Sequence, residues 1–321
     1  MQFRTELIPH DSPIYISHDQ ETVLVGSCFS ENLGEKLQAN KFKVHINPFG
    51  TLYDPISIFR VLNFAIKGVS NFSFVEREGS WYAYETHSEV RAATQTQLQS
   101  DLETLVNLTK QQLLSSNTLF ITLGTALVYR KLDEGIVVAN CHKMPARNFC
   151  QSLLEPAEIL EAFSEFYQAL KLFHPQIQII FTLSPVRHIK DGIENNQVSK
   201  SLLRYCISRF TQYSDTHYFP AYEIVLDDLR DYRFYKADLI HPNDQAISYI
   251  WEKFSSLYFK AQTLGILKEW QKIRQNLAHK PFDQSSDGYR DHLRRTLSQL
   301  ENLSAYLDVT KEMQYISSIL N

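Results

Sequence analysis

Long apolar runs and a surplus of positive charge are both missing from this sequence, and each absence excludes a class of protein. No stretch is long and apolar enough to cross a bilayer, so we expect no membrane span. The 321 residues include 32 Lys and Arg against 36 Asp and Glu, which gives a net charge of -4. Because nucleic-acid binding needs a basic surface, we expect no nucleic-acid partner. The sequence also lacks a glycine-rich phosphate loop, which argues against a nucleotide-binding protein.

Cysteine is scarce, and its four copies are widely spaced. Cys28, Cys141, Cys150 and Cys206 form no C-x-x-C pair, so a zinc site has little support. The polar start MQFRTELIPHDSP lacks the apolar core of a signal peptide. We therefore expect a cytoplasmic protein with reduced thiols, and we expect neither a metal ion nor a cofactor.

Apolar runs that end in turn-forming residues indicate a parallel sheet. The runs at 22–25, 119–123 and 177–183 are continuously apolar, as is typical of strands covered by helices on both faces. Amphipathic helical patterns at 94–114 and 155–173 precede the second and third runs. This alternation predicts a three-layer α/β/α fold with a doubly wound, mainly parallel sheet.

Shorter patterns add elements around this sheet. Residues 43–46 and 217–219 are predicted to be short strands, the second of them at an edge. Residues 72–85 alternate around Glu78-Gly79, which predicts a β-hairpin near the mouth of the sheet.

The composition changes from about residue 262. Residues 264–276 and 289–307 have helical patterns whose Leu and Ile spacing is typical of core or dimer contacts. We therefore predict an α/β domain over residues 1–260 and a helical extension over residues 261–321. We expect the extension to be available for homo-oligomer formation.

A candidate nucleophile stands directly after the first predicted strand. Gly26-Ser27-Cys28-Phe29-Ser30 joins that strand to a helix, at the place where doubly wound sheets bind ligands. The positive end of a helix dipole lowers the pKa of a thiol, and the N–H groups there can hold an oxyanion. Cys28 is therefore a candidate nucleophile. A buried structural cysteine, with Ser27 and Ser30 as helix N-caps, would give the same pattern.

A candidate base lies near the end of the α/β region. Asp238 and His241 are three residues apart, just before an amphipathic helix. An aspartate at this spacing can accept a hydrogen bond from one imidazole nitrogen and leave the other facing a nucleophile. A turn and a helix N-cap, supported by Pro242, would give the same local pattern. The order of the two groups along the chain favours a Cys–His–Asp centre.

Six separated segments carry a resemblance to a known family. They are 26–30 (GSCFS), 47–55 (NPFGTLYDP), 122–125 (TLGT), 139–143 (ANCHK), 184–188 (SPVRH) and 228–234 (DLRDYRF). In these segments the chain resembles the GSCFA family, within the SGNH or GDSL-like hydrolases. The resemblance covers roughly residues 1–260 and implies an SGNH-hydrolase-like fold of flavodoxin-like topology.

The resemblance also implies roles for individual residues. The first SGNH motif reads G-D-S with serine as nucleophile, and Cys28 falls on that serine, with Ser27 as the alternative. Gly50 matches the glycine whose backbone N–H helps to bind the oxyanion. The third motif normally supplies an asparagine as another donor. That asparagine is missing here, and Thr125 or Asn140 is the expected substitute.

Further polar residues are candidates for substrate contact. Arg187 and His188 follow the third strong strand, at the same edge of the sheet as Cys28. They are expected either to contact an anionic part of the substrate or to fix a loop over residues 190–200. His142 is expected either to contribute to the site or to be a hydrogen-bonded loop histidine.

Together these features predict a hydrolase or acyltransferase that acts on an acyl ester of a small molecule or glycan. A non-catalytic binding module on the same fold is the main alternative, and it would form no acyl adduct. A metalloenzyme using His142, His188 and His241 is another, and it would contain metal and be sensitive to chelators.

Overall fold

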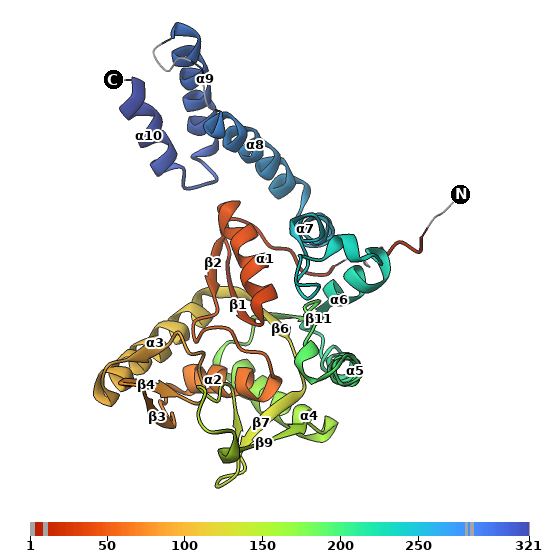
Figure 1. Cartoon of the computed structure of the whole chain (residues 1–321). Helices are drawn as coiled ribbons and strands as arrows, with labels where there is room; N and C mark the ends of the chain where they lie inside the picture. Colours follow the sequence, from red (N-terminus) through yellow and green to blue (C-terminus); the bar gives the residue numbers. More distant parts are fainter. Residues whose placement is uncertain (1–3, 9–11, 280–281, 283–285, 321) are drawn as a thin grey trace.

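A five-stranded sheet forms the centre of the chain. The structure is a computed structural model that describes residues 4–8, 12–279, 282 and 286–320. The strands are β1 (Glu21–Gly26), β2 (Lys43–Ile46), β6 (Ser116–Leu123), β10 (Gln178–Leu183) and β11 (Thr216–Phe219). They lie in the order β11-β10-β6-β1-β2, and every neighbouring pair is parallel (Figure 1). Counted along the chain this is the flavodoxin-like order 2-1-3-4-5, which confirms the predicted topology.

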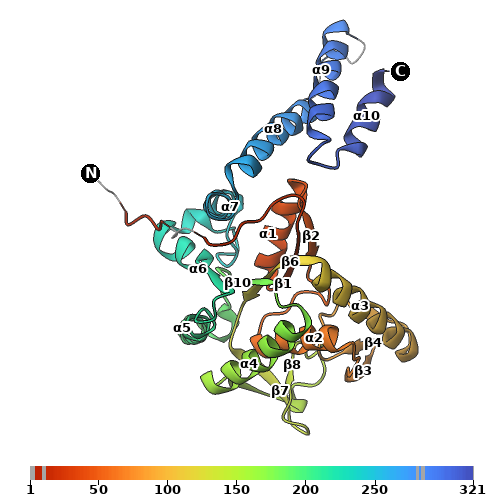
Figure 2. The ribbon, with the colours of Figure 1, turned by 180° about the vertical axis from the view of Figure 1, so that it is seen from behind.

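Helices cover both faces of the sheet. One face carries α2 (Pro55–Lys67), α3 (Gln95–Ser115), α4 (Pro156–Phe173) and α5 (Ile193–Phe210), and the other carries α1 (Cys28–Ala39), α6 (Ala221–Glu223) and α7 (Asp244–Tyr258). Each face has its own hydrophobic core. Val23 and Val25 pack in the core on the α2 face and Leu24 packs in the core on the α1 face, because side chains alternate along a strand. Figures 1 and 2 show α1 and α7 across the sheet from α2, α3 and α4. The predicted three-layer α/β/α fold is confirmed.

Two small antiparallel sheets flank the main one. The first contains β3 (Phe74–Arg77), β4 (Ser80–Ala83) and β5 (Arg91–Ala92), and the second contains β7 (Leu127–Lys131), β8 (Val137–Val138) and β9 (Phe149–Leu153). The β3–β4 pair is the predicted hairpin, and Glu78 and Gly79 at its turn both have positive φ, as a two-residue turn requires. The second small sheet was not predicted.

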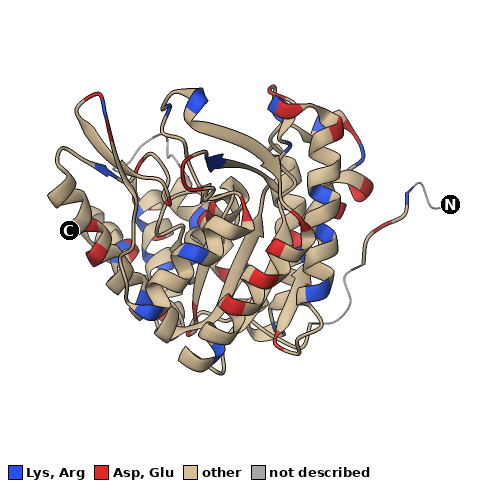
Figure 3. Ribbon diagram, turned by 90° about the horizontal axis from the view of Figure 1, so that it is seen from below, with Lys and Arg blue, Asp and Glu red and all other residues tan. Residues whose placement is uncertain are grey.

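Short helical turns complete the α/β region. They are three 3₁₀ turns (Ala146–Asn148, Ile189–Asp191 and Tyr232–Phe234) and a π-helical turn (Ile224–Asp228). In Figure 3, seen from below, Lys and Arg are interspersed with Asp and Glu.

Residues 190–200, expected to be a loop, contain the start of α5, and this expectation is corrected. The helix begins at Ile193 after Gly192, and its first two turns bury the polar residues Asn196, Ser199 and Lys200. The apolar spacing that identifies a helix starts only at Leu203. The polar residues on the buried face therefore hid the helix from the sequence pattern.

The described residues of the C-terminal part form three helices. They are α8 (Ala261–Ala278), α9 (Asp287–Leu303) and α10 (Thr310–Leu320), of which α10 was not predicted. They share a hydrophobic cluster of their own and extend away from α7 and α1 (Figures 1 and 2). Trp270 Nε1 donates to the Ala39 carbonyl oxygen at 2.9 Å, and Lys41 pairs with Glu312 at 2.8 Å. Among the described residues, no helix has the length and apolarity needed to cross a membrane.

Candidate active site

Cys28 and His241 line one pocket at the carboxyl ends of the central strands. The pocket has a volume of about 350 Å³ and lies beyond the point where the strand order reverses, between β1 and β6. Each neighbouring loop contributes lining residues: Cys28 from the start of α1, Tyr53 and Asp54 from the loop before α2, Thr125 after β6, Arg187 and His188 after β10, and His241 before α7. The topology thus brings together segments that are far apart in the sequence.

Ser27 and Cys28 have different surroundings, although they are neighbours. Ser27 is the N-cap of α1, is fully buried, and its hydroxyl accepts the Phe29 N–H at 3.3 Å. Cys28 is the first residue of the helix, is only partly buried, and lines the pocket. The structure places Cys28 on the pocket and uses the Ser27 hydroxyl to cap the helix, which favours Cys28 over Ser27 as the candidate nucleophile.

The pKa of the Cys28 thiol is raised rather than lowered, which corrects the expectation from its position at a helix N-terminus. Burial is the largest cause, and the nearby Glu31 carboxylate raises the pKa further. Lys200 and the backbone N–H groups of Cys28 and Phe29 oppose this rise but do not offset it. Cys28 therefore rests as a thiol, and a base must remove its proton during any attack.

Glu31→Gln is expected to lower the pKa of Cys28, because it removes a negative charge beside the thiol. The thiolate fraction at a given pH then rises, so alkylation of Cys28 by iodoacetamide at pH 8 speeds up several-fold. The measurement is the alkylation rate at Cys28 from pH 7 to 11, followed by peptide mass spectrometry. Glu35→Gln, an exposed position on the same helix, is the matched control. An alkylation curve that stays in place in Glu31→Gln would contradict this account of the thiol.

Asp238 fixes the orientation of the His241 ring and the tautomer of its neutral form. One carboxylate oxygen of Asp238 accepts the backbone N–H groups of Ile240 (2.9 Å) and His241 (3.0 Å), and the other lies 2.7 Å from His241 Nδ1. These bonds lower the pKa of Asp238 to about 2, so the carboxylate is an acceptor only. Nδ1 must then carry the proton of the neutral ring, which leaves the Nε2 lone pair free.

The loop that carries Asp238 and His241 is fixed to the end of β10 by Arg187. The Arg187 N–H donates to the Ile240 carbonyl at 3.3 Å, and its guanidinium donates to the Leu239 carbonyl at 3.4 Å. The guanidinium also lies 4.1 Å from the centre of the Tyr235 ring. Arg187 lines the pocket, but these contacts assign its side chain first to positioning the Asp–His loop.

In the part of the chain that the structure describes, no hydrogen bond joins Cys28 to His241. Both side chains nevertheless line the same pocket. Catalytic hydrogen bonds in ligand-free enzymes are often long and shorten only when substrate binds. The arrangement therefore places a thiol and an oriented imidazole on one cavity, where an acyl group can lie between them.

Lys200, which the sequence analysis missed, lies under the pocket. Its side chain is 1% exposed, and Nζ donates to the carbonyl oxygens of Gly124 and Ser184, each at 2.7 Å. Burial lowers its pKa to about 7, and the nearby Cys28 opposes this shift. The signal available in the sequence was a polar residue on the buried face of a helix that follows a central strand.

Two other polar residues of α5 hold the neighbouring loops. Ser199 Oγ accepts the Ala126 N–H at 2.7 Å and lies 3.1 Å from the Thr125 hydroxyl. Asn196 Oδ1 accepts the His188 N–H at 2.9 Å. Together with Lys200, these side chains fix the backbone at the carboxyl ends of β6 and β10.

His142 and Asn140 do not line the pocket, and His142 has the contacts of the hydrogen-bonded loop histidine that was the alternative. His142 is buried, its Nε2 lies 2.8 Å from the Ala83 carbonyl oxygen, and its Nδ1 lies 3.2 Å from the Ser88 hydroxyl. Asn140 Oδ1 accepts the His142 N–H at 2.8 Å. Both residues tie the hairpin to the neighbouring turn. With both ring nitrogens engaged there, His142 does not share a metal site with His188 and His241.

Gly50, the expected oxyanion donor, has its backbone N–H engaged within its own turn. Its N–H already donates to the Asn47 carbonyl at 2.8 Å. Its φ is +76°, and a Cβ on Gly50 would lie 2.4 Å from the Cβ of His87. Thr125 does line the pocket, but its hydroxyl accepts the Leu127 N–H at 3.0 Å in addition to its contact with Ser199.

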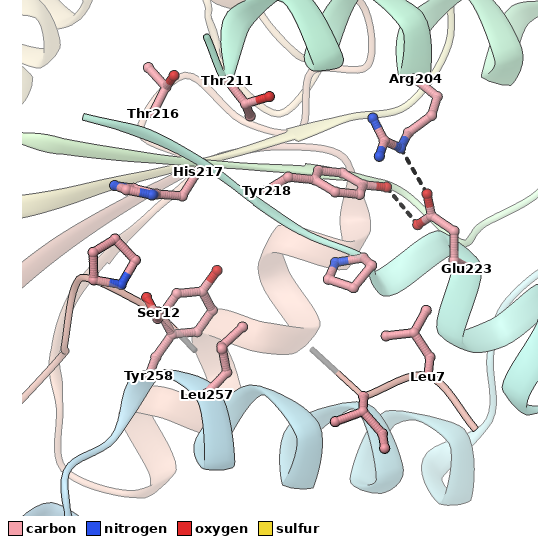
Figure 4. Close-up of a pocket in the computed structure, with 13 residues that line it drawn as sticks. Leu7, Ser12, Arg204, Thr211, Thr216, His217, Tyr218, Glu223, Leu257 and Tyr258 are labelled. Carbon is pink, nitrogen blue, oxygen red and sulfur yellow. Dashed lines mark hydrogen bonds and ion pairs between the residues drawn. The ribbon is translucent and has the colours of Figure 1, made fainter. Parts of the chain in front are cut away.

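A larger pocket of about 530 Å³ lies beside β11 (Figure 4). Polar groups in its lining are paired with each other. Arg204 Nε donates to Glu223 at 2.9 Å, and the Tyr218 hydroxyl donates to Glu223 at 2.6 Å. Neither Cys28 nor His241 lines it. The smaller pocket is therefore the candidate active site, because it is lined by Cys28 and His241.

Comparisons with known proteins bear on the family. A model described as the GSCFA family matches residues 21–254, and one described as the GSCFA domain protein, C-terminal domain, matches residues 270–321. No curated protein matches the sequence.

Several solved structures are similar at low identity. A carbohydrate esterase family 3 structure from Talaromyces cellulolyticus is 7% identical, with 78% of this chain and 99% of that chain covered and a TM-score of 0.35. The family 3 carbohydrate esterase of Clostridium thermocellum is 10% identical, with 78% and 97% covered and a TM-score of 0.33. A family 2 enzyme from Corynascus thermopiles (Myceliophthora fergusii) is 12% identical, with 79% and 69% covered and a TM-score of 0.37. Likeness at this level does not bear on the activity.

Proposed function

This chain belongs to the GSCFA family, and we propose that it is an ester hydrolase or acyltransferase that forms an acyl thioester at Cys28. One observation carries the proposal: a thiol at a helix N-terminus and an imidazole oriented by a carboxylate line the same pocket. We propose a small-molecule or glycan ester as the substrate and the cytoplasm as the location.

The first half of the proposed reaction forms the thioester. His241 Nε2 takes the proton from the Cys28 thiol while the sulfur attacks the acyl carbonyl carbon, and the carbonyl electrons move to its oxygen. The Cys28 N–H, at the positive end of α1, is placed to donate to that oxyanion. When the oxyanion collapses, the C–O bond breaks and protonated His241 gives its proton to the leaving alkoxide.

The second half releases the acyl group. Water or a second alcohol attacks the thioester carbonyl and loses its proton to His241 Nε2. The tetrahedral intermediate then expels Cys28, which regains the proton from His241 as a thiol. Asp238 stays ionised throughout and stabilises the imidazolium that forms in both halves.

The pocket favours a short acyl group. Its volume of about 350 Å³ is at the lower end of ligand pockets. Its lining includes the apolar side chains of Val128, Val138, Ala139 and Val186. An acetyl or similarly small acyl group is therefore the first choice for a test.

The proposal is tested by incubating the wild-type protein with p-nitrophenyl acetate and measuring its intact mass. We expect a gain of one acetyl group, and peptide mapping should place it on Cys28 as a thioester cleaved by neutral hydroxylamine. Activated esters with longer acyl chains extend the test. If none of these esters gives a site-specific adduct, a non-catalytic ligand-binding module on the same fold becomes the better account.

His241→Ala is expected to slow acetylation of Cys28 by roughly 10²–10⁴-fold, because the thiol loses the base that removes its proton. Asp238→Asn should also slow it, since the Nδ1 proton loses its acceptor. The measurement is the rate of p-nitrophenol release in the first turnover. His279→Ala, an exposed histidine in the C-terminal part, is the control and should react like the wild type. Normal acetylation in His241→Ala would refute its role as base.

A further inference from the structure

We propose that the imidazole of His188 is a catalytic hydrogen-bond donor, giving its Nε2–H to the oxyanion that forms when Cys28 attacks an ester. This inference rests on the proposed function and adds a residue to it. It assigns to His188 a part in the reaction itself, rather than contact with an anionic portion of the substrate.

The backbone donors expected near the oxyanion are already occupied. The Gly50 N–H donates to Asn47, and the N–H groups of Gly124 and Thr125 both donate to the Tyr53 carbonyl, at 2.7 and 3.1 Å. The asparagine expected after Gly124 is also missing. Of these expected donors, the Cys28 N–H alone then remains for the oxyanion. Oxyanion sites generally combine two or more donors.

The Nε2 atom of His188 has no hydrogen-bond partner among the described residues and belongs to a side chain of the pocket wall. It is enclosed by protein, and buried polar atoms are nearly always paired. His188 lines the pocket together with Cys28 and His241. Its Nε2 lies 3.3 Å from the position that a Cβ would take on Gly124, so it is beside the carboxyl end of β6.

The His188 ring is held in place before any substrate binds. Its backbone N–H donates to Asn196 Oδ1 at 2.9 Å. Its ring meets the Tyr53 ring edge to face, with 5.5 Å between ring centres and 81° between planes. A donor fixed in this way does not need to reorganise when negative charge develops nearby.

The His188 ring is uncharged at neutral pH. Burial lowers its pKa to about 4, and the Lys200 ammonium adds to this effect. An imidazole with this pKa is a poor base at pH 7, which leaves the base role to His241. A neutral imidazole can still polarise a carbonyl oxygen through its N–H, as other enzymes do.

The test compares two reactions of Cys28 in His188→Leu and His188→Gln. Acetylation by p-nitrophenyl acetate passes through an oxyanion, whereas alkylation by iodoacetamide does not. We expect His188→Leu to slow acetylation by roughly 10²-fold or more and to leave alkylation close to the wild-type rate. His188→Gln should recover part of the acetylation rate, because its side-chain amide supplies an N–H. Both rates are read at the Cys28 peptide by mass spectrometry, so the other cysteines do not interfere.

Each outcome is distinct. Unchanged acetylation in His188→Leu overturns the inference, and an equal fall in both reactions overturns it as well, since His188 would then act on the thiol or the fold. A wild-type protein that is alkylated but never acetylated refutes the proposed function instead. His217→Leu, on β11 and outside this pocket, is the matched control for loss of an imidazole. Thermal unfolding of all variants shows whether the fold is kept.

Discussion

Cys28→Ala is expected to leave no acyl adduct and no ester turnover, whereas Ser27→Ala is expected to keep both. The alanine at position 28 removes the only pocket-lining thiol in the described part of the chain, and His241 then has no proton to remove. We expect a fall in single-turnover rate of at least about 10³-fold. The fully buried Ser27 hydroxyl lies outside the pocket, so its loss leaves the chemistry in place.

The Ser27→Ala variant has a separate effect on stability. Its hydroxyl caps α1, and losing a cap of this kind costs about 1 kcal/mol of unfolding free energy. The two variants thus separate chemistry from folding: Cys28→Ala loses reaction but unfolds near the wild-type temperature, and Ser27→Ala reacts but unfolds earlier. Acetylation with p-nitrophenyl acetate and thermal unfolding measure the two effects. An adduct that persists in Cys28→Ala and vanishes in Ser27→Ala would reverse the assignment.

Gly26→Ala is expected to destabilise the protein by about 3–5 kcal/mol or to prevent soluble expression. Gly26 has φ +135°, a conformation that residues with a Cβ rarely adopt, and it ends β1 against β6. A Cβ there would lie 2.1 Å from the Thr122 carbonyl oxygen, which also accepts the Ser27 N–H. The added methyl therefore forces apart the two central strands just before Cys28, the proposed nucleophile.

Gly135→Ala is the matched control for this prediction. Gly135 also has positive φ, at +69°, but a Cβ on it meets no atom within 4 Å. Its substitution should cost only about 1–2 kcal/mol, which is the backbone strain alone. Urea unfolding of both variants gives the comparison. Similar losses in the two variants would show that the contact with Thr122 is relieved by a small shift of the strands.

The sheet could be predicted from the sequence because its strands are buried on both faces. The runs at 22–25, 119–123 and 177–183 are apolar without interruption, and each corresponds to a central strand of the structure. The start of α5 and the whole of α10 could not be predicted in this way. The first has polar side chains on its buried face, and the second buries only Ile316 fully.

The sequence could predict those parts of the candidate site that depend on the topology of the sheet. It could not predict those parts that depend on individual hydrogen bonds. Cys28 and His241 line one pocket because Cys28 follows a central strand and the loop before α7 lies at the same edge of the sheet. The role of Gly50 could not be predicted, because it depends on which carbonyl its N–H meets in the folded turn. The effect of Lys200 on the pKa of His188 could not be predicted either, because it depends on packing between a loop and a helix, which no local sequence pattern shows.

The contacts that α5 makes with the pocket loops have a consequence for how substrate preference can change. Lys200, Ser199 and Asn196 bind backbone atoms, which are present whatever the side chains are. Those atoms are Gly124 O, Ser184 O, Ala126 N and His188 N. Loop side chains that line the cavity can therefore be exchanged while the loop backbone keeps its supports. The start of α5 thus fixes the backbone around the pocket independently of the side chains that line it, so the proposed acyl specificity can change by substitution of lining side chains without a new fold.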